Sequence, residues 1–176
     1  MDFSDFNNVT WTEIPNNHSD AFFETVQADN YAFAHIEPYV YFHGGYNENY
    51  PVGNFMARMN MNEAPLNTEI ISKSVDMPPG RSYHSLTAIG NKLYMFGGYD
   101  GEKTSDELWS YDVAKEKWEF MPIFGINPSK RMGHAATAHG INLLIWGGHD
   151  GLTYYNDMYL FNVLSKTWEE MPIYSY

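Results

Sequence analysis

Short apolar runs, each closed by glycine or another turn-forming residue, dominate the second half of the chain. Leu93 to Phe96 is apolar throughout and ends at Gly97-Gly98. An uninterrupted apolar run of this length is typical of a strand that is buried on both faces. The preceding Gly90-Asn91 pair suits a tight hairpin turn. The pattern therefore predicts four short strands, at residues 82–89, 92–98, 107–113 and 118–122.

The same pattern occurs again without a gap, at a shift of 50 residues. The matched positions are Arg81 and Arg131, His84 and His134, Gly97-Gly98 and Gly147-Gly148, Asp100-Gly101 and Asp150-Gly151, Trp118 and Trp168, and Met121-Pro122 and Met171-Pro172. The second copy predicts strands over 143–146, 158–163 and 168–172. Self-similarity at a fixed period indicates a repeat architecture in which each repeat is one supersecondary unit.

These repeated residues resemble the kelch motif. In each copy an apolar run is followed by Gly-Gly, then by an aromatic residue, then by Trp; the aromatic residues are Tyr111 and Phe161. The resemblance covers residues 79–176. It implies an all-β fold of the β-propeller type, whose blades are four-stranded antiparallel sheets arranged around a central channel.

The first part of the chain follows the pattern less closely. Residues 9–15 have the spacing of a fourth strand without its own blade, because Trp11 and Pro15 are spaced like Trp118 and Pro122. The pattern predicts a divergent blade over residues 16–77, followed by kelch blades over 78–127 and 128–176. All three blades and the extra strand belong to a single region, residues 1–176.

Within the divergent blade, Tyr39 to Gly45 matches the second strand and its Gly-Gly pair. Counting from Gly44 places Tyr31 where the next blade has His84, and Ala28 where it has Arg81. Counting forward places Phe55-Met56 where it has Leu108-Trp109. The expected tryptophan near residue 70 is missing, so we expect Ile70 or Ile71 to fill its volume.

Three blades and one spare strand form an incomplete ring, because propellers close with about four to eight blades. The first and last blades would each leave an apolar face uncovered. We therefore expect completion by further blades of a longer propeller, by a second copy of the chain, or by docking in a larger assembly. A homo-oligomer is one of these expectations.

Composition restricts the other classes of function. The chain carries a net charge of −12, with no cysteine and 17% aromatic residues. Such acidity argues against nucleic acid as a partner, because binding phosphates requires clusters of Lys and Arg. The N-terminal residues do not resemble a signal peptide, and no apolar run is long enough for a membrane span. We expect a cytoplasmic protein that makes no membrane contact, because absence of cysteine fits a reducing compartment.

Enzymatic chemistry has little support in the sequence. His84 and His134 repeat at one position, which favours a structural role over a metal ligand, and we expect no metal, no cofactor and no catalytic residue. The copper radical oxidases of the kelch class use a Tyr joined to Cys, which a chain without Cys cannot form. An enzyme or enzyme-associated specifier with a pocket lined by His84 or His134 remains the alternative.

Arg81 and Arg131 each precede the first strand of a blade. Since neighbouring strands are antiparallel, these arginines should lie at the same end of the blades as the residues that follow Gly-Gly. The predicted partner-binding residues are Arg81, Arg131, Tyr46, Tyr99 and His149. In related kelch adaptors this end is a common docking surface for an extended, often acidic peptide.

The alternative is that each arginine binds carbonyl oxygens or a carboxylate of the adjacent blade, and Ala28 in the first blade is a departure from an arginine ring. If the arginines bind a peptide, replacing both with Ala should weaken binding without changing the melting temperature. The sequence thus predicts a non-enzymatic protein-interaction module or scaffold, with an acidic peptide as one expected partner.

Overall fold

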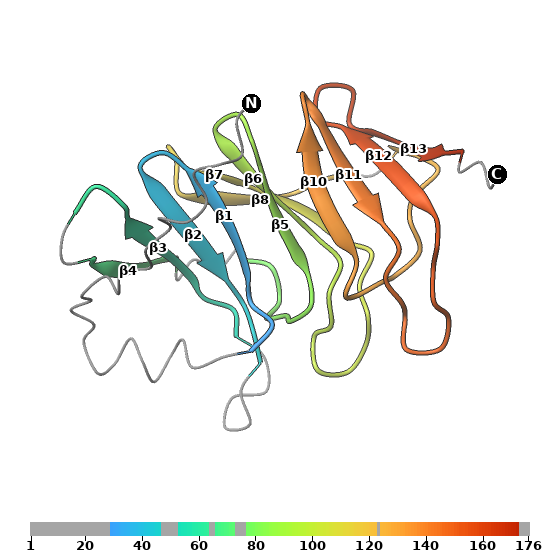
Figure 1. Ribbon diagram of the computed structural model, residues 1–176, viewed down its shortest axis with the longest axis horizontal. Helices are drawn as coiled ribbons and strands as arrows, with labels where there is room; N and C mark the ends of the chain where they lie inside the picture. The colour runs from blue at the N-terminus through green and yellow to red at the C-terminus, as the bar shows by residue number, and fades with distance from the viewer. Residues whose placement is uncertain (1–28, 47–52, 64–65, 73–76, 123, 173–176) are drawn as a thin grey trace, which may run out of the picture.

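Antiparallel sheets make up the described part of the chain. The structure is a computed structural model that describes residues 29–46, 53–63, 66–72, 77–122 and 124–172. The first sheet has the order β1-β2-β3-β4, the second β5-β6-β7-β8, and the third β10-β11-β12-β13-β9. Figure 1 shows the three sheets side by side in chain order as an open array. No helix occurs within the described residues.

The strands follow the predicted repeat closely. Those of the first blade are β1 (Ala32–Ile36), β2 (Tyr39–His43), β3 (Met56–Asn60) and β4 (Thr68–Ser72). Those of the second blade are β5 (Ser85–Ile89), β6 (Lys92–Phe96), β7 (Leu108–Asp112) and β8 (Lys117–Phe120). Those of the third blade are β10 (Ala135–His139), β11 (Asn142–Trp146), β12 (Met158–Asn162) and β13 (Thr167–Met171). The prediction of four-stranded antiparallel blades is confirmed. The candidate strand at residues 9–15 lies outside the described residues.

An additional strand, β9 (Phe124–Gly125), pairs in parallel with β13 on the outer edge of the third blade. The segment that leaves the second blade therefore adds a fifth strand to the third. The repeat comparison did not predict β9, because a two-residue strand has no periodicity of its own. Its position covers part of a sheet edge that would otherwise present unpaired backbone groups.

Two apolar cores lie between successive blades. Trp118 packs in the core between the first and second blades, and Trp168 packs in the core between the second and third. Their exposed fractions are 2% and 3%, so both indoles are buried at equivalent positions. Because apolar burial is the main favourable term in folding, each blade depends on its neighbour for stability.

The strand pairing corrects two expectations for the first blade. Met56 pairs with His43 in the register in which Leu108 pairs with Phe96. Met56, and not Phe55, is therefore the equivalent of Leu108, because the loop before β3 is one residue longer than its counterpart.

Thr68, and not Ile70 or Ile71, takes the position of Trp118. Thr68 pairs with Met59 in the register in which Trp118 pairs with Tyr111. Ile71 packs against the core between the first two blades, whereas the equivalent of Trp118 in the first blade would face away from the second blade, so Ile71 does not fill the missing volume.

No helix within the described residues is long and apolar enough to cross a membrane.

Candidate binding rim

The five predicted partner-binding residues lie at one end of the blades, which we call the rim. Isolated bridges pair Asp29 with Tyr46, Ser82 with Tyr99, and Met132 with His149. Each bridge joins the segment before the first strand of a blade to the residue after its Gly-Gly pair. Arg81 and Arg131 directly precede two of these bridges. The antiparallel pairing of the strands thus produces the expected gathering at one end.

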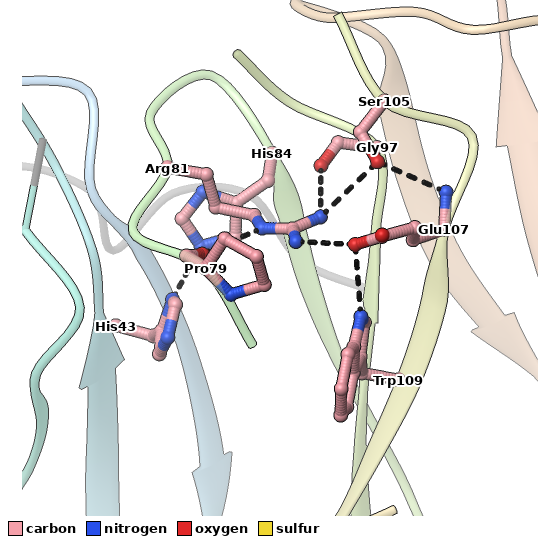
Figure 2. Close-up of polar contacts among 8 residues, drawn as sticks. All are labelled: His43, Pro79, Arg81, His84, Gly97, Ser105, Glu107 and Trp109. Carbon is pink, nitrogen blue, oxygen red and sulfur yellow. Dashed lines mark hydrogen bonds and ion pairs between the residues drawn. The ribbon is translucent and has the colours of Figure 1, made fainter. Parts of the chain in front are cut away.

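The side chain of Arg81 connects three loop segments at the rim of the second blade by hydrogen bonds (Figure 2). Its Nε donates to the carbonyl oxygen of Pro79 at 3.1 Å, and its Nη1 donates to that of Gly97 at 3.0 Å. Its Nη2 donates to Glu107 Oε2 at 2.6 Å, and Trp109 Nε1 donates to the same oxygen at 3.1 Å. Burial alone would raise the pKa of Glu107, but hydrogen bonds from Arg81 and Trp109 hold it below its usual value.

Arg131 makes the same contacts in the third blade. Its Nε donates to the carbonyl oxygen of Ser129 at 3.0 Å, and its Nη1 to that of Gly147 at 2.9 Å. Asp157 accepts from Nη1 at 2.6 Å and from Nη2 at 3.0 Å, which is the two-point geometry that guanidinium and carboxylate groups favour. The ring of Tyr155 lies 4.4 Å from the guanidinium carbon.

These contacts bury the two arginines, which are 1% and 0% exposed. Each guanidinium group binds carbonyls and a carboxylate of its own blade, not of the adjacent blade as the alternative supposed. Direct contact of Arg81 and Arg131 with a peptide stays a prediction, and the burial of both guanidinium groups disfavours it. In this structure the two arginines position the loops of the rim.

The Gly-Gly pairs bring successive blades into close backbone contact. Gly45 N–H donates to the carbonyl oxygen of Arg81, and Gly98 N–H donates to that of Arg131, each at 2.9 Å. Gly97 has φ of +66°, and a Cβ atom there would lie 2.6 Å from the Arg131 carbonyl oxygen. Only glycine combines this backbone conformation with this approach. The side chains of Arg81 and Arg131 thus bind their own blades, and their carbonyl oxygens accept hydrogen bonds from the preceding blades.

A second backbone link runs between the blades at the rim. Tyr83 N–H donates to the carbonyl oxygen of Asn30 at 3.1 Å, and Gly133 N–H donates to that of Tyr83 at 2.9 Å. These three equivalent residues all have positive φ, of 59°, 57° and 64°. A left-handed conformation is energetically unfavourable for a residue as bulky as tyrosine. The ring of Tyr83 lies at the surface and is 44% exposed.

Among the described residues of the rim, tyrosine rings are the most exposed aromatic groups. Tyr46 is 43% exposed, while Tyr154 is 85% exposed and stacks against His149 with ring centroids 5.2 Å apart. Tyr99 is held more closely, because its hydroxyl donates to the carbonyl oxygen of Gly101 at 2.7 Å. Comparison of the two repeats missed Tyr83 and Tyr154, because the equivalent positions in the other repeat hold Gly133 and Thr104, so neither tyrosine is repeated.

Carboxylates also line the rim, in tight turns after the Gly-Gly pairs. Asp100 Oδ1 accepts from the backbone N–H groups of Glu102 and Lys103, and Asp150 Oδ1 does so from Leu152 and Thr153. Burial tends to raise the pKa of Asp100, but these N–H donors hold it below its ordinary value. Lys103 and Lys130 are exposed and lie in the same hollow as Asp100.

The repeated histidines lie at the contacts between successive blades. His84 Nε2 is 3.1 Å from His43 Nδ1, and His134 Nε2 is 2.9 Å from the hydroxyl of Ser85. Within the part of the chain that the structure describes, no group of three His, Cys, Asp or Glu side chains is arranged to hold a metal ion. The geometry of both histidines is that of contacts between blades.

Comparison with known proteins agrees with this architecture. The model of the KLHDC2/KLHL20/DRC7 Kelch-repeats domain matches residues 3–176. The chain therefore belongs to the kelch-repeat family.

Several characterised relatives match shorter segments. Kelch-like protein 25 of Homo sapiens is 43% identical over 51 residues, which are 28% of this chain and 8% of the relative. The Kelch repeat and BTB domain-containing protein 2 of cowpox virus (strain GRI-90 / Grishak) is 28% identical over 96 residues, 53% of this chain and 16% of the relative. The N-(sulfonatooxy)prop-2-enimidothioate sulfolyase of Thlaspi arvense is 33% identical over 66 residues, 36% of this chain and 19% of the relative. The matches thus span less than a fifth of the length of these relatives.

Proposed function

We propose that this chain is a non-enzymatic interaction module that binds a protein or peptide at the rim. The observation that carries the proposal is a set of exposed tyrosines, Tyr46, Tyr83 and Tyr154, fixed on a rigid frame of buried arginines and backbone links between blades. Tyrosine is favoured in binding hot spots, because it offers a large contact area with few rotatable bonds. Loops held by a rigid scaffold are the usual location of such sites.

The charge of the partner is a separate part of the proposal. The sequence favoured an acidic peptide because of Arg81 and Arg131, but Glu107 and Asp157 already pair with those two charges. An acidic peptide would instead meet Lys103 and Lys130, beside the carboxylates of Asp100 and Glu102. Measuring affinity for matched acidic and basic versions of one bound peptide decides between these signs.

Selection of peptides from a displayed random library tests the site. A peptide that binds the rim should lose at least about tenfold in affinity when Tyr83 and Tyr154 are both changed to Ala, the scale of a hot-spot loss. Leu164→Ala is the matched control, because Leu164 is 75% exposed at the opposite end of the third blade. Selected peptides that respond equally to both changes, or to neither, would contradict binding at the rim.

We also propose that the open end of the array is completed by a further kelch blade, from a longer propeller, a second copy or an assembly partner. The outer face of the third blade carries Leu144, Trp146, Met158 and Met171, which match the core residues Tyr94, Phe96, Leu108 and Met121 of the second blade. Phe96 is 0% exposed, whereas Trp146 is 52% exposed. Because the outer face of the third blade carries the same kinds of residue as the buried face of the second blade, we expect another kelch blade to pack against it.

The enzyme-associated alternative rests on the match to a protein named as a sulfolyase. That match covers 36% of this chain, and His84 and His134 each contact a side chain of the preceding blade. Turnover of a thioimidate sulfate by the purified chain, lost on His84→Ala with folding intact, would favour this alternative over the interaction module.

A further inference from the structure

Two buried histidines meet at the contact between the first and second blades. His43 ends β2 and is 0% exposed, and His84 lies just before β5 and is 8% exposed. His43 Nδ1 and His84 Nε2 are 3.1 Å apart, and the rings are perpendicular with centroids 5.0 Å apart (Figure 2). Such a bond requires one N–H and one lone pair, so at least one of the two rings is neutral.

His43 takes the position that Phe96 takes in the next blade. The Phe96 ring packs against His134 and Trp168, each with ring centroids 5.3 Å apart. The His43 ring packs in the same way against His84 and against Trp118, whose centroid is 5.3 Å away. The imidazole thus keeps the packing of a phenyl ring and adds a group that can bind a proton.

Few charged groups surround this pair. Burial, followed by the charge of Arg81, lowers the pKa of His43 to about 3. Burial also lowers the pKa of His84 well below its usual value, with smaller contributions from His43, Arg81 and His134.

Apolar neighbours complete the surroundings of the pair. The strand neighbours of His43 are Ala32 and Met56, and Trp118 covers the ring from β8. Glu107 pairs with Arg81 and is not among the groups that shift either histidine. His43 Nε2 and His84 Nδ1 have no hydrogen-bond partner within the described residues, so an added proton would have no acceptor there.

We propose that the contact between the first two blades is an acid-sensitive joint, in which protonation of His43 or His84 releases the first blade while the second and third remain packed. Two buried imidazoles share this contact, whereas the contact between the second and third blades has Phe96 and His134. His134 Nδ1 likewise has no partner within the described residues, but His134 Nε2 is bonded to the Ser85 hydroxyl, whose oxygen can accept a hydrogen bond from a protonated ring, so this contact holds one titratable ring instead of two.

The direction of the effect follows from proton linkage. A histidine whose pKa is lower in the closed joint than in the open one binds its proton mainly in the open state. The closed joint is therefore fully stable above the ordinary histidine pKa and loses stability as pH falls towards 3. Between pH 7 and pH 5, each such histidine raises the ratio of open to closed joints by about 25-fold. Two histidines make the first joint open at a higher pH than the second.

Hydrogen exchange measured by mass spectrometry on the full chain tests this joint. The wild type is compared with His43→Phe at the same pH, so that the intrinsic pH dependence of exchange cancels. At pH 5 we expect β1 and β2 to exchange about 25-fold faster in the wild type than in the variant, with a small difference at pH 7. Strands β11 and β12 should exchange equally in both proteins. Equal exchange of β1 and β2 at pH 5, or acceleration spread over all three blades, would overturn the proposal.

A second measurement does not depend on the variant. Chemical shifts of labelled imidazole rings, followed from pH 8 to pH 5, report the protonation of each histidine in the folded chain. We expect His43 and His84 to remain neutral in molecules whose joint is closed. If both rings titrate near pH 6.5 while the fold is unchanged, the closed contact tolerates protonated histidines, and the proposal of an acid-sensitive joint is wrong.

Discussion

Arg81 and Glu107 form an ion pair of 2.6 Å in which the guanidinium group is buried and the carboxylate reaches the surface. Arg131 and Asp157 repeat this relationship at the same distance in the next blade. Burial lowers the pKa of Arg81, and Glu107 partly offsets that effect. Each arginine also binds the carbonyl oxygen of the first glycine of the Gly-Gly pair, Gly97 or Gly147. The ion pair therefore joins the ends of two strands to the loop that precedes the first strand of the blade.

Replacing Arg81 or Arg131 with Ala should therefore destabilise the fold, by about 3 kcal/mol each, because the carbonyl and carboxylate oxygens that each buried guanidinium group binds lose their donor. This reverses the expectation that the melting temperature would not change. Chemical denaturation of the single variants measures the loss. Arg58→Ala is the control, because Arg58 forms its ion pairs with Glu69 and Glu116 at the surface and should contribute at most about 1 kcal/mol. Unchanged stability of both single variants would show that the arginines are not structural.

Gly97→Ala should be more costly than Gly90→Ala, although both glycines have positive φ. A Cβ at Gly97 would meet the Arg131 carbonyl oxygen at 2.6 Å and the His134 ring at 2.9 Å, whereas a Cβ at Gly90 would meet nothing within 4 Å. Both variants share the backbone strain, of about 1 kcal/mol. Overpacking should add about 1–3 kcal/mol at Gly97 alone. Equal midpoints in urea denaturation would refute the close approach of the blades.

Trp168→Ala should destabilise the chain by about 3–5 kcal/mol, the range for deleting a large buried aromatic side chain. Trp168 packs against both Phe96 and Phe161, with ring centroids 5.3 Å and 5.1 Å away. Trp118→Ala should have a similar effect at the preceding contact. Trp146→Ala is the comparison, because Trp146 is half-exposed and its removal should cost much less. If the three variants unfold at the same denaturant concentration, the packing between blades is not as described.

Local sequence patterns predicted most of the fold, because strands, hairpin turns and Gly-Gly pairs depend on neighbouring residues and recur at one spacing. The end of the blades at which Arg81, Tyr99 and His149 gather also followed from antiparallel pairing. The burial of the arginines did not follow, because it depends on Glu107 and Asp157, which are 26 residues away along the chain. Position Thr68 was missed for a related reason: the loop before β3 is one residue longer than in the second blade and the connection from β3 to β4 is two residues longer, and counting along the chain cannot detect such insertions.

The role of His43 was also hidden in the sequence. Its equivalents Phe96 and Trp146 are aromatic, which indicates a packing position but does not reveal the contact with a second histidine. Only the facing His84 from the next blade shows that the ring lies in a contact between blades. Sequence repeats reveal what successive blades have in common, whereas a contact between two different blades depends on the positions at which they differ.

The chain of 176 residues should not be a free monomer in solution. Phe33 on the outer face of the first blade is 66% exposed, and Trp146 on the outer face of the third is 52% exposed. Their equivalents in the second blade, Leu86 and Phe96, are buried, so these faces have the composition of cores. Contiguous apolar patches above a few hundred Å² are uncommon on soluble monomers.

Light scattering coupled to size-exclusion chromatography at micromolar concentration measures this directly. We expect a dimer or larger species for the chain alone. Trp146→Glu should shift it towards the monomer, because a charge in a buried apolar contact is costly. Leu152→Glu is the control, because Leu152 is 93% exposed on the rim and does not lie on the outer face of the third blade. A soluble wild-type monomer that binds no hydrophobic dye would show that these faces need no partner.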